Sequence, residues 1–190
     1  CAVTLHVGLG TFEPMKHENV EHHVMHSEYA SVQRSAVVQL REHLVGVRED
    51  KTRRTVCIGT TSLRTAESLH WLGVGLMNGT MKKGDDLVVT QWGWKDTPAV
   101  DVLNSLATVI AYMDECGIEE LHFPTGLMIT PGYPFAICDT ILTNFHQPKS
   151  TLLVLVSGFV GDDRRREIYS EALSNDYRFL SYGDASLLFR

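Results

Sequence analysis

The sequence lacks any long uninterrupted apolar segment. Its longest apolar stretch, Leu152 to Val160, contains Ser157 and Gly158 and is far too short to cross a bilayer. No basic segment leading into an apolar stretch stands at its start, so we expect neither a signal peptide nor a membrane partner. The composition is otherwise that of a globular domain, with 190 residues of which 44% are hydrophobic and 21% charged. A membrane protein, a collagen and a coiled coil are therefore excluded.

The sequence also lacks an excess of positive charge. It has 17 basic and 23 acidic residues, which gives a formal net charge of −6. A free-standing basic nucleic-acid-binding domain is excluded, because such a domain attracts phosphates with a positive surface. There is no internal repeat and no low-complexity linker, so the chain is predicted to form part of a single domain.

Cysteine is scarce and widely spaced. The four cysteines, Cys1, Cys57, Cys116 and Cys138, form no CxxC pair, and we predict four reduced, mostly buried thiols rather than a disulfide or zinc framework. Cys1 leads directly into the alternating pattern of residues 3–7, which is typical of a strand. A start in mid-strand predicts that the chain is a fragment of a longer protein.

Strand-like and helix-like segments alternate along the chain. Predicted strands lie at 2–7, 53–58, 87–92, 127–130 and 137–143, and predicted helices at 33–45, 63–72, 100–116, 150–160 and 163–175. Residues 22–32 have mixed character, and the aromatic tail 177–189 is expected to pack back on the body. The alternation predicts an α/β fold with a largely parallel sheet or barrel.

The segment 59–68 (GTTSLRTAES) places hydroxyl groups where a strand gives way to a helix. Free N–H groups at a helix start attract anions, and Thr60, Thr61 and Ser62 add further donors. Arg64 suits bidentate binding of a phosphate or carboxylate. The alternative, equally compatible with the pattern, is simple N-capping with Arg64 on a solvated face.

A second polar loop, 143–151 (TNFHQPKST), follows another predicted strand. Ser150 is a natural N-cap for the next helix. In parallel α/β folds ligands bind beyond the carboxyl ends of strands, where Asn144, His146 and Lys149 would be displayed. The polar density favours a binding role over a capped helix with an incidental histidine.

Histidine is abundant, with nine in the chain. His17, His22, His23 and His26 lie close before Glu28, but their spacing matches no compact zinc pattern such as HExxH, so no metal site is predicted. If this segment is extended, His22, His26 and Glu28 share one face, which suits a general base or a ligand-orienting group. Solvated or structural histidines are the alternative.

A Gly-Asp pair among aromatic residues predicts a tight turn near the end of the chain, in the segment 177–184 (YRFLSYGD). Such a turn presents the carboxylate of Asp184. That carboxylate either pairs with Arg178 or contacts a ligand, and the pattern does not decide between them.

Six segments spread from Val3 to Leu188 form an ordered, specific pattern. They are 3–12 (VTLHVGLGTF) with Pro14, 23–28 (HVMHSE), 59–68, 131–135 (PGYPF), 143–153 and 177–185. Together they resemble the S-adenosylmethionine:tRNA ribosyltransferase-isomerases of queuosine biosynthesis. The resemblance implies that residues 1–190 are the C-terminal portion of a large catalytic α/β domain that looks like a distorted β/α barrel. The family's N-terminal part and its inserted small β-barrel domain would lie outside this chain, and 73–124 is predicted to be an insertion atypical of the family.

The resemblance also implies a reaction. The ribosyl group of S-adenosylmethionine, the co-substrate, would be transferred to an aminomethyl-deazaguanine base at the wobble position of tRNA and isomerised, giving epoxyqueuosine-tRNA, adenine and methionine. Removal of a ribose proton beside the sulfonium needs a base, and the implied catalytic residues are His26, Glu28, His146 and Asp184. The implied binding residues are Thr60, Thr61, Ser62, Arg64, Tyr133, Asn144, Lys149 and Ser150.

The resemblance implies no metal and a cytoplasmic enzyme, which we expect to be a monomer. A net charge of −6 fits a tRNA partner poorly unless local cations, such as Lys149, Arg64 or Arg164 to Arg166, make the contact. The alternative is a divergent S-adenosylmethionine-binding relative that acts on another acceptor or lacks catalysis.

Overall fold

The computed structural model describes residues 4–6 and 20–190, except 26, 96 and 99. The strands are β1 (Thr4–His6), β2 (Glu28–Gln33), β3 (Val56–Ile58), β4 (Glu120–Thr125), β5 (Thr140–Asn144) and β6 (Ala185–Phe189). The helices are the 3-10 helix η2 (Val20–His22) and the α-helices α1 (Arg34–Glu49), α2 (Thr60–Met77), α3 (Val102–Cys116), α4 (Thr151–Val160) and α5 (Asp162–Ser174).

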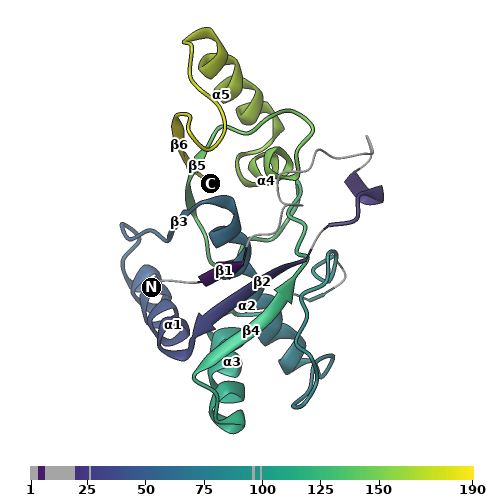
Figure 1. Ribbon diagram of the computed structural model, residues 1–190. Coiled ribbons are helices and arrows are strands. Elements are labelled where there is room, and N and C mark those ends of the chain that lie inside the picture. The colour runs from purple at the N-terminus through teal and green to yellow at the C-terminus, as the bar shows by residue number, and fades with distance from the viewer. Residues whose placement is uncertain (1–3, 7–19, 26, 96, 99) are drawn as a thin grey trace.

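The described strands form two three-stranded sheets (Figure 1). One has the order β1-β2-β4 with antiparallel pairings, and the other has the order β3-β5-β6, in which β3 and β5 are parallel and β5 and β6 antiparallel. The predicted mixed α/β class is confirmed, and the described strands close no barrel. The prediction of a largely parallel sheet is wrong, because β3 and β5 are the only parallel pair among the described strands. Strand β2 alternates buried and exposed residues over part of its length, as expected of an antiparallel strand with one solvated face.

Two strand predictions are wrong, and neither β4 nor β6 was predicted as a strand. Residues 87–92 contribute a single bridge, Val89 to Thr125, before turning away, and residues 127–130 are irregular. Strand β4 contains Pro124, which has no N–H to donate. It is tolerated because β4 lies at the edge of its sheet.

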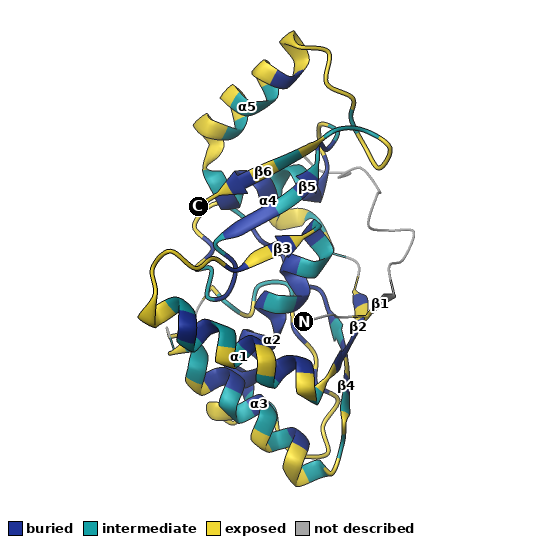
Figure 2. Ribbon diagram, turned by 90° about the vertical axis from the view of Figure 1, so that its left-hand side faces the viewer, coloured by how far each residue is buried: buried dark blue, intermediate teal, exposed yellow. Residues whose placement is uncertain are grey.

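Helices α1, α2 and α3 pack beside the β1-β2-β4 sheet and below the β3-β5-β6 sheet in the view of Figure 2, and they supply much of the core. Leu63, Leu69 and Leu72 of α2 are almost fully buried, as are Leu106 and Met113 of α3. Residues 73–124 therefore contribute core side chains, and their assignment as a family-atypical insertion stays a prediction. Both α4 and α5 match the predicted helices closely, and the tail packs back on the body as β6.

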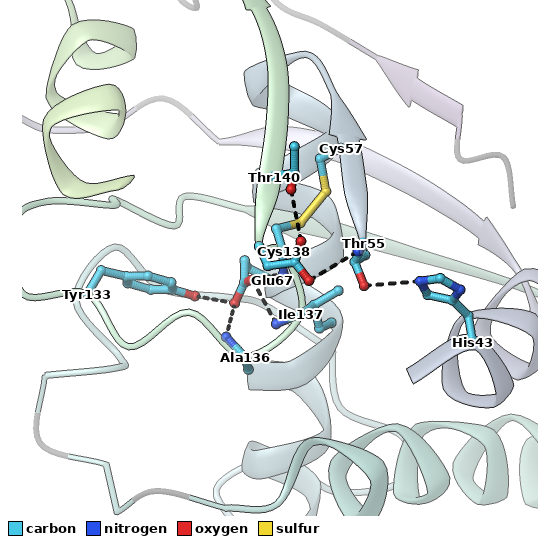
Figure 3. Close-up of a disulfide and its surroundings, with 10 residues drawn as sticks. His43, Thr55, Cys57, Glu67, Tyr133, Ala136, Ile137, Cys138 and Thr140 are labelled. Atoms are coloured by element: carbon cyan, nitrogen blue, oxygen red, sulfur yellow. Dashed lines mark hydrogen bonds between the residues drawn. A yellow bond between two sulfur atoms is a disulfide. The ribbon is translucent and has the colours of Figure 1, made fainter. Parts of the chain in front are cut away.

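Cys57 and Cys138 form a disulfide, which corrects the prediction that both are reduced thiols (Figure 3). Cys57 lies on β3 and Cys138 lies just before the neighbouring strand β5, so parallel pairing brings their Cα atoms to 6.4 Å. They are 81 residues apart in sequence, and this separation hides the pairing from any local pattern. Cys116 is a free thiol.

Candidate functional site

A cavity of about 470 Å³ opens where the parallel strands β3 and β5 end. Segments far apart in sequence line it: the start of α2, the loop between β5 and α4, and the turn before β6. The polar lining residues predicted from sequence to bind ligand or act in catalysis are Thr60, Thr61, Ser62, Asn144, His146 and Ser150. The two polar loops, 59–62 and 143–150, thus meet at one cavity, beyond the carboxyl ends of strands where α/β folds bind ligands.

The start of α2 brings to this cavity backbone N–H groups that have no acceptor within the helix. Gly59, at φ 85°, precedes the helix and has no side chain with which to cap it. The first helical N–H that reaches an acceptor within the helix is that of Leu63, which donates to the Gly59 carbonyl at 3.2 Å. The N–H groups of Thr60, Thr61 and Ser62 precede it and have no acceptor in the helical pattern, which suits an anionic group.

The start of α4 is a second helix end at the same cavity. Ser150 is its N-cap, as predicted: its Oγ accepts the N–H of Leu153 at 3.2 Å and donates to the Gln147 carbonyl at 2.8 Å. Lys149, also predicted to bind ligand, is exposed and adopts a positive φ of 57° beside these lining residues. Positive potential from two helix ends therefore converges on one cavity.

His146 lies in the wall of the cavity and is held from two sides. Its Nε2 lies 3.0 Å from Thr143 Oγ1, and its backbone N–H donates to the Tyr169 hydroxyl at 3.0 Å. Burial lowers the pKa of His146 to about 4, so the imidazole is neutral at pH 7. Asn144 donates from Nδ2 to the carbonyls of Gly183 and Asp184, at 3.3 Å each, which joins this loop to the turn before β6.

Glu28 and Arg64 form a buried ion pair away from the cavity lining. Their side chains are 4% and 3% exposed, and the pair joins β2 to α2. Burial lowers the pKa of Arg64, while the Glu28 carboxylate opposes that change. Arg64 was expected either to bind an anion or to lie on a solvated face, and the structure commits its Nη2 to the carboxylate of Glu28 instead.

Tyr133 belongs to a different buried network, centred on Glu67 (Figure 3). The fully buried Glu67 carboxylate accepts the N–H groups of Ala136, Ile137 and Cys138 at 2.9–3.0 Å and lies 3.3 Å from the Tyr133 hydroxyl. Burial raises the pKa of Glu67, and these donors oppose that rise. Sequence reasoning did not single out Glu67, although an acidic residue between the apolar Leu63 and Leu69 is a signal that could have marked it.

Asp184 lies next to the cavity rather than in its lining. Its Oδ2 accepts the backbone N–H of Arg178 at 2.7 Å, and the Arg178 guanidinium lies 3.9 Å away. The pairing with Arg178, one of the two alternatives for Asp184, is thus present. His26, predicted to be catalytic, lies outside the described residues, as does the segment 7–12 of the family-like pattern.

Other cavities lie outside this site. One, of about 530 Å³, lies between α2 and the start of α3, and its lining residues Arg48 and Asp101 pair with each other. Within the described part of the chain, no three His, Cys, Asp or Glu side chains come together as metal ligands would. No described helix combines the length and apolar character needed to span a bilayer.

The fold and the cavity place the chain among mixed α/β domains that have a ligand-sized cavity at the end of a parallel strand pair. The described lining of this cavity contains no carboxylate and no ammonium group. The sequence profile of a family described as "Queuosine biosynthesis protein" matches residues 1–188. The chain belongs to this family.

Individual relatives agree with the family assignment. The chain is 37% identical over 188 residues to an S-adenosylmethionine:tRNA ribosyltransferase-isomerase of Rickettsia bellii, covering 99% of this chain and 40% of that protein. It is 38% identical to the protein of that name from Sinorhizobium medicae, covering 99% of this chain and 39% of the relative. The chain therefore spans about 40% of the length of these relatives.

A solved structure supports the fold. The crystal structure of an S-adenosylmethionine tRNA ribosyltransferase from Thermotoga maritima is similar to this chain, with a TM-score of 0.55 and 31% identity. The match covers 97% of this chain and 43% of that one.

Proposed function

We propose that this chain forms the S-adenosylmethionine-binding part of a tRNA ribosyltransferase-isomerase. The reaction would transfer the ribosyl group of S-adenosylmethionine to the aminomethyl-deazaguanine base at the tRNA wobble position and isomerise it, releasing adenine and methionine. The observation that carries the proposal is the meeting of the two polar loops, 59–62 and 143–150, around one cavity of about 470 Å³. Both loops belong to the segments that resemble the family, and the relatives reported above are named S-adenosylmethionine:tRNA ribosyltransferase-isomerases.

The chemistry of the lining suits the methionine and ribose parts of the co-substrate. The N–H groups at the start of α2 that have no acceptor within the helix would bind the methionine carboxylate, helped by the hydroxyls of Thr60 and Ser62. The hydroxyl of Thr61 and the amide of Asn144 would contact the ribose hydroxyls. The positive end of α4 adds to the attraction for the carboxylate.

The proton acceptor would be a neutral histidine. Glu28 is committed to Arg64, and the Asp184 carboxylate accepts the N–H of Arg178, so neither carboxylate faces the cavity. His146 is neutral and lines the cavity, which makes it our candidate for orienting the substrate or accepting a proton. His26 stays a second candidate from the sequence, and Glu28 and Asp184 are proposed to position the elements around the site.

The decisive experiment uses the longer protein that contains this chain, supplied with S-adenosylmethionine and tRNA bearing the precursor base. Mass spectrometry of the nucleosides should detect the epoxy product, with free adenine formed in equal amount. Adenine release without a change in the tRNA would favour a divergent relative acting on another acceptor. If neither product forms although S-adenosylmethionine binds, a non-catalytic binding protein is the better description.

A matched pair of variants tests the cavity itself. Thr60→Val removes a hydroxyl from the cavity, whereas Thr108→Val removes one from the outer part of α3 that bonds only to its own helix. We expect Thr60→Val to weaken S-adenosylmethionine binding about ten-fold, the loss typical of one hydrogen bond to a charged group. Calorimetry that finds equal affinities for the two variants would place the binding site elsewhere.

A further inference from the structure

The turn before β6 holds one tyrosine entirely in solvent at the mouth of the cavity. Leu180 and Ser181 line the cavity, and Tyr182 follows them directly with a relative exposure of 99%. The next most exposed large hydrophobic side chain in the described part of the chain is that of Val24, at 80%. A ring this exposed contributes nothing to the core, so its position calls for another explanation.

The turn that carries Tyr182 is rigidly built. The N–H of Leu180 donates to the Phe145 carbonyl at 2.9 Å, that of Gly183 to the Leu180 carbonyl at 2.9 Å, and that of Asp184 to the Arg178 carbonyl at 2.8 Å. A Cβ on Gly183 would stand 2.3 Å from the Arg178 carbonyl oxygen, so the turn closes too tightly for any other residue. Tyr182 is therefore exposed on a fixed support.

Residues with strained backbone conformations lie in the loops that border the cavity. In the described part of the chain, the non-glycine residues with positive φ are Lys149, Asp176 and Leu180. All three lie in the two loops that border the cavity, 145–150 and 175–184. Left-handed conformations of such residues are costly and persist where the surroundings fix them, often at ligand-binding sites.

Two exposed cations, Arg178 and Lys149, lie on the two loops that border the cavity, although the whole chain is acidic. The Arg178 side chain is 77% exposed, and its ion pair with Asp184 is long, at 3.9 Å. Lys149 is exposed beside the lining residues Gln147 and Ser150. Proteins bind unpaired nucleobases by combining an exposed aromatic ring, which stacks on the base, with cations on the same surface, which contact phosphates.

We propose that Tyr182 is a stacking platform for an unpaired nucleobase of the RNA substrate at the mouth of the cavity, with Arg178 and Lys149 contacting the adjoining phosphates. This inference rests on the proposed function, because it assigns the ring to the RNA that would bring its reactive base to the cavity. Tyr182 is a positioning residue in this scheme. It contributes to RNA binding and leaves S-adenosylmethionine binding unchanged.

The test uses the longer protein and a synthetic anticodon stem-loop, with affinities measured by fluorescence anisotropy. Tyr182→Ala should weaken RNA binding about ten-fold, within the range measured for loss of one stacked base. Tyr182→Phe should restore nearly full affinity because the ring is kept. Leu173→Ala, which shortens an exposed apolar side chain on α5, is the control and should change nothing. With precursor-bearing tRNA, Tyr182→Ala should raise KM for tRNA and leave KM for S-adenosylmethionine and kcat near the wild-type values.

The salt dependence separates the cations from the ring. Arg178→Gln keeps the hydrogen bonds of the turn, which use the backbone of this residue and the carboxylate of Asp184, and removes only the long ion pair of 3.9 Å. It should lower the slope of log affinity against log salt by about 0.7, the value for one phosphate contact on a single strand, whereas Tyr182→Ala should leave the slope unchanged.

The outcomes distinguish this inference from the proposed function. If the wild-type protein modifies tRNA and Tyr182→Ala binds and modifies it equally well, the stacking platform is wrong and the proposed function stands. If Tyr182→Phe is as impaired as Tyr182→Ala, the hydroxyl rather than the ring matters, and stacking is also wrong. If the wild-type protein does not bind the stem-loop, both proposals are wrong.

Discussion

Among single residues, the buried Glu67 carboxylate accepts three backbone N–H groups and lies 3.3 Å from the Tyr133 hydroxyl. We expect Glu67→Gln to destabilise the protein by about 2 kcal/mol, because the new amide group turns a donor toward backbone N–H groups that need an acceptor. Urea denaturation measures the change in the free energy of unfolding. The control is Glu167→Gln on the exposed side of α5, which should stay within about 0.5 kcal/mol of wild type. Equal stability of the two variants would contradict this role of Glu67.

His146 should make stability depend on pH. Its pKa of about 4 in the folded protein lies below the ordinary value of 6.5, so the unfolded chain binds more protons between these values. Stability is therefore full above pH 6.5 and falls as the pH drops toward 4. From pH 7.5 to pH 5 the loss from this group should be about 2 kcal/mol. His70, whose pKa burial also lowers to about 4, adds a similar loss.

A histidine variant checks this assignment. His146→Gln should remove the part of the stability loss between pH 7.5 and pH 5 that is due to His146, while the part due to His70 remains. The free energy of unfolding, measured by urea denaturation at both pH values, gives the comparison. A variant that keeps the whole wild-type pH dependence would show that His146 is not the titrating group.

At the scale of elements, a glycine with positive φ precedes each of two helices. Gly59 before α2 has φ 85° and ψ 149°, and Gly161 before α5 has φ 86° and ψ 155°. Neither would clash through a new Cβ, so alanine costs only backbone strain, about 1–3 kcal/mol in each case. We expect equal losses of stability from Gly59→Ala and Gly161→Ala. Only Gly59→Ala should also weaken S-adenosylmethionine binding, because α2 begins at the cavity and α5 does not.

The disulfide links two elements of the fold by joining β3 to the segment before β5. Replacing both Cys57 and Cys138 with alanine should lower the free energy of unfolding by up to about 4 kcal/mol, since the cross-link closes a loop of some 80 residues. Cys116→Ala is the control. Thiol labelling of the denatured, unreduced protein should leave Cys57 and Cys138 unmodified; labelling of both would show that the bond is absent.

Helices were more predictable than strands for a physical reason. The apolar spacing of α1, α3 and α4 is local, and all three lie within a few residues of their predicted bounds. Gly46, just after the predicted helix 33–45, lies inside α1, where a Cβ would stand 2.3 Å from the Arg53 side chain. Strand β4 went unrecognised because its pairing with β2 joins segments about 90 residues apart.

At the scale of the whole molecule, one sheet face is apolar and open. The register of β3, β5 and β6 places Val56, Ile58, Leu187 and Phe189 on the same side, and each is at least half exposed. The isolated chain should therefore bind a hydrophobic dye or self-associate. Replacing Ile58 and Phe189 with threonine should reduce the dye fluorescence, whereas Leu173→Thr on α5 should not. Equal fluorescence for all three proteins would place the apolar surface elsewhere.

The sequence by itself determined the helices, the mixed α/β class and the two polar loops, because each of these depends on residues close together in the chain. The tertiary structure alone decided that these loops share a cavity, that Glu28 neutralises Arg64, and that Cys57 bonds to Cys138. The last two pairs join residues 36 and 81 positions apart. Local periodicity carries no information about such partners, since they are set by how whole elements pack.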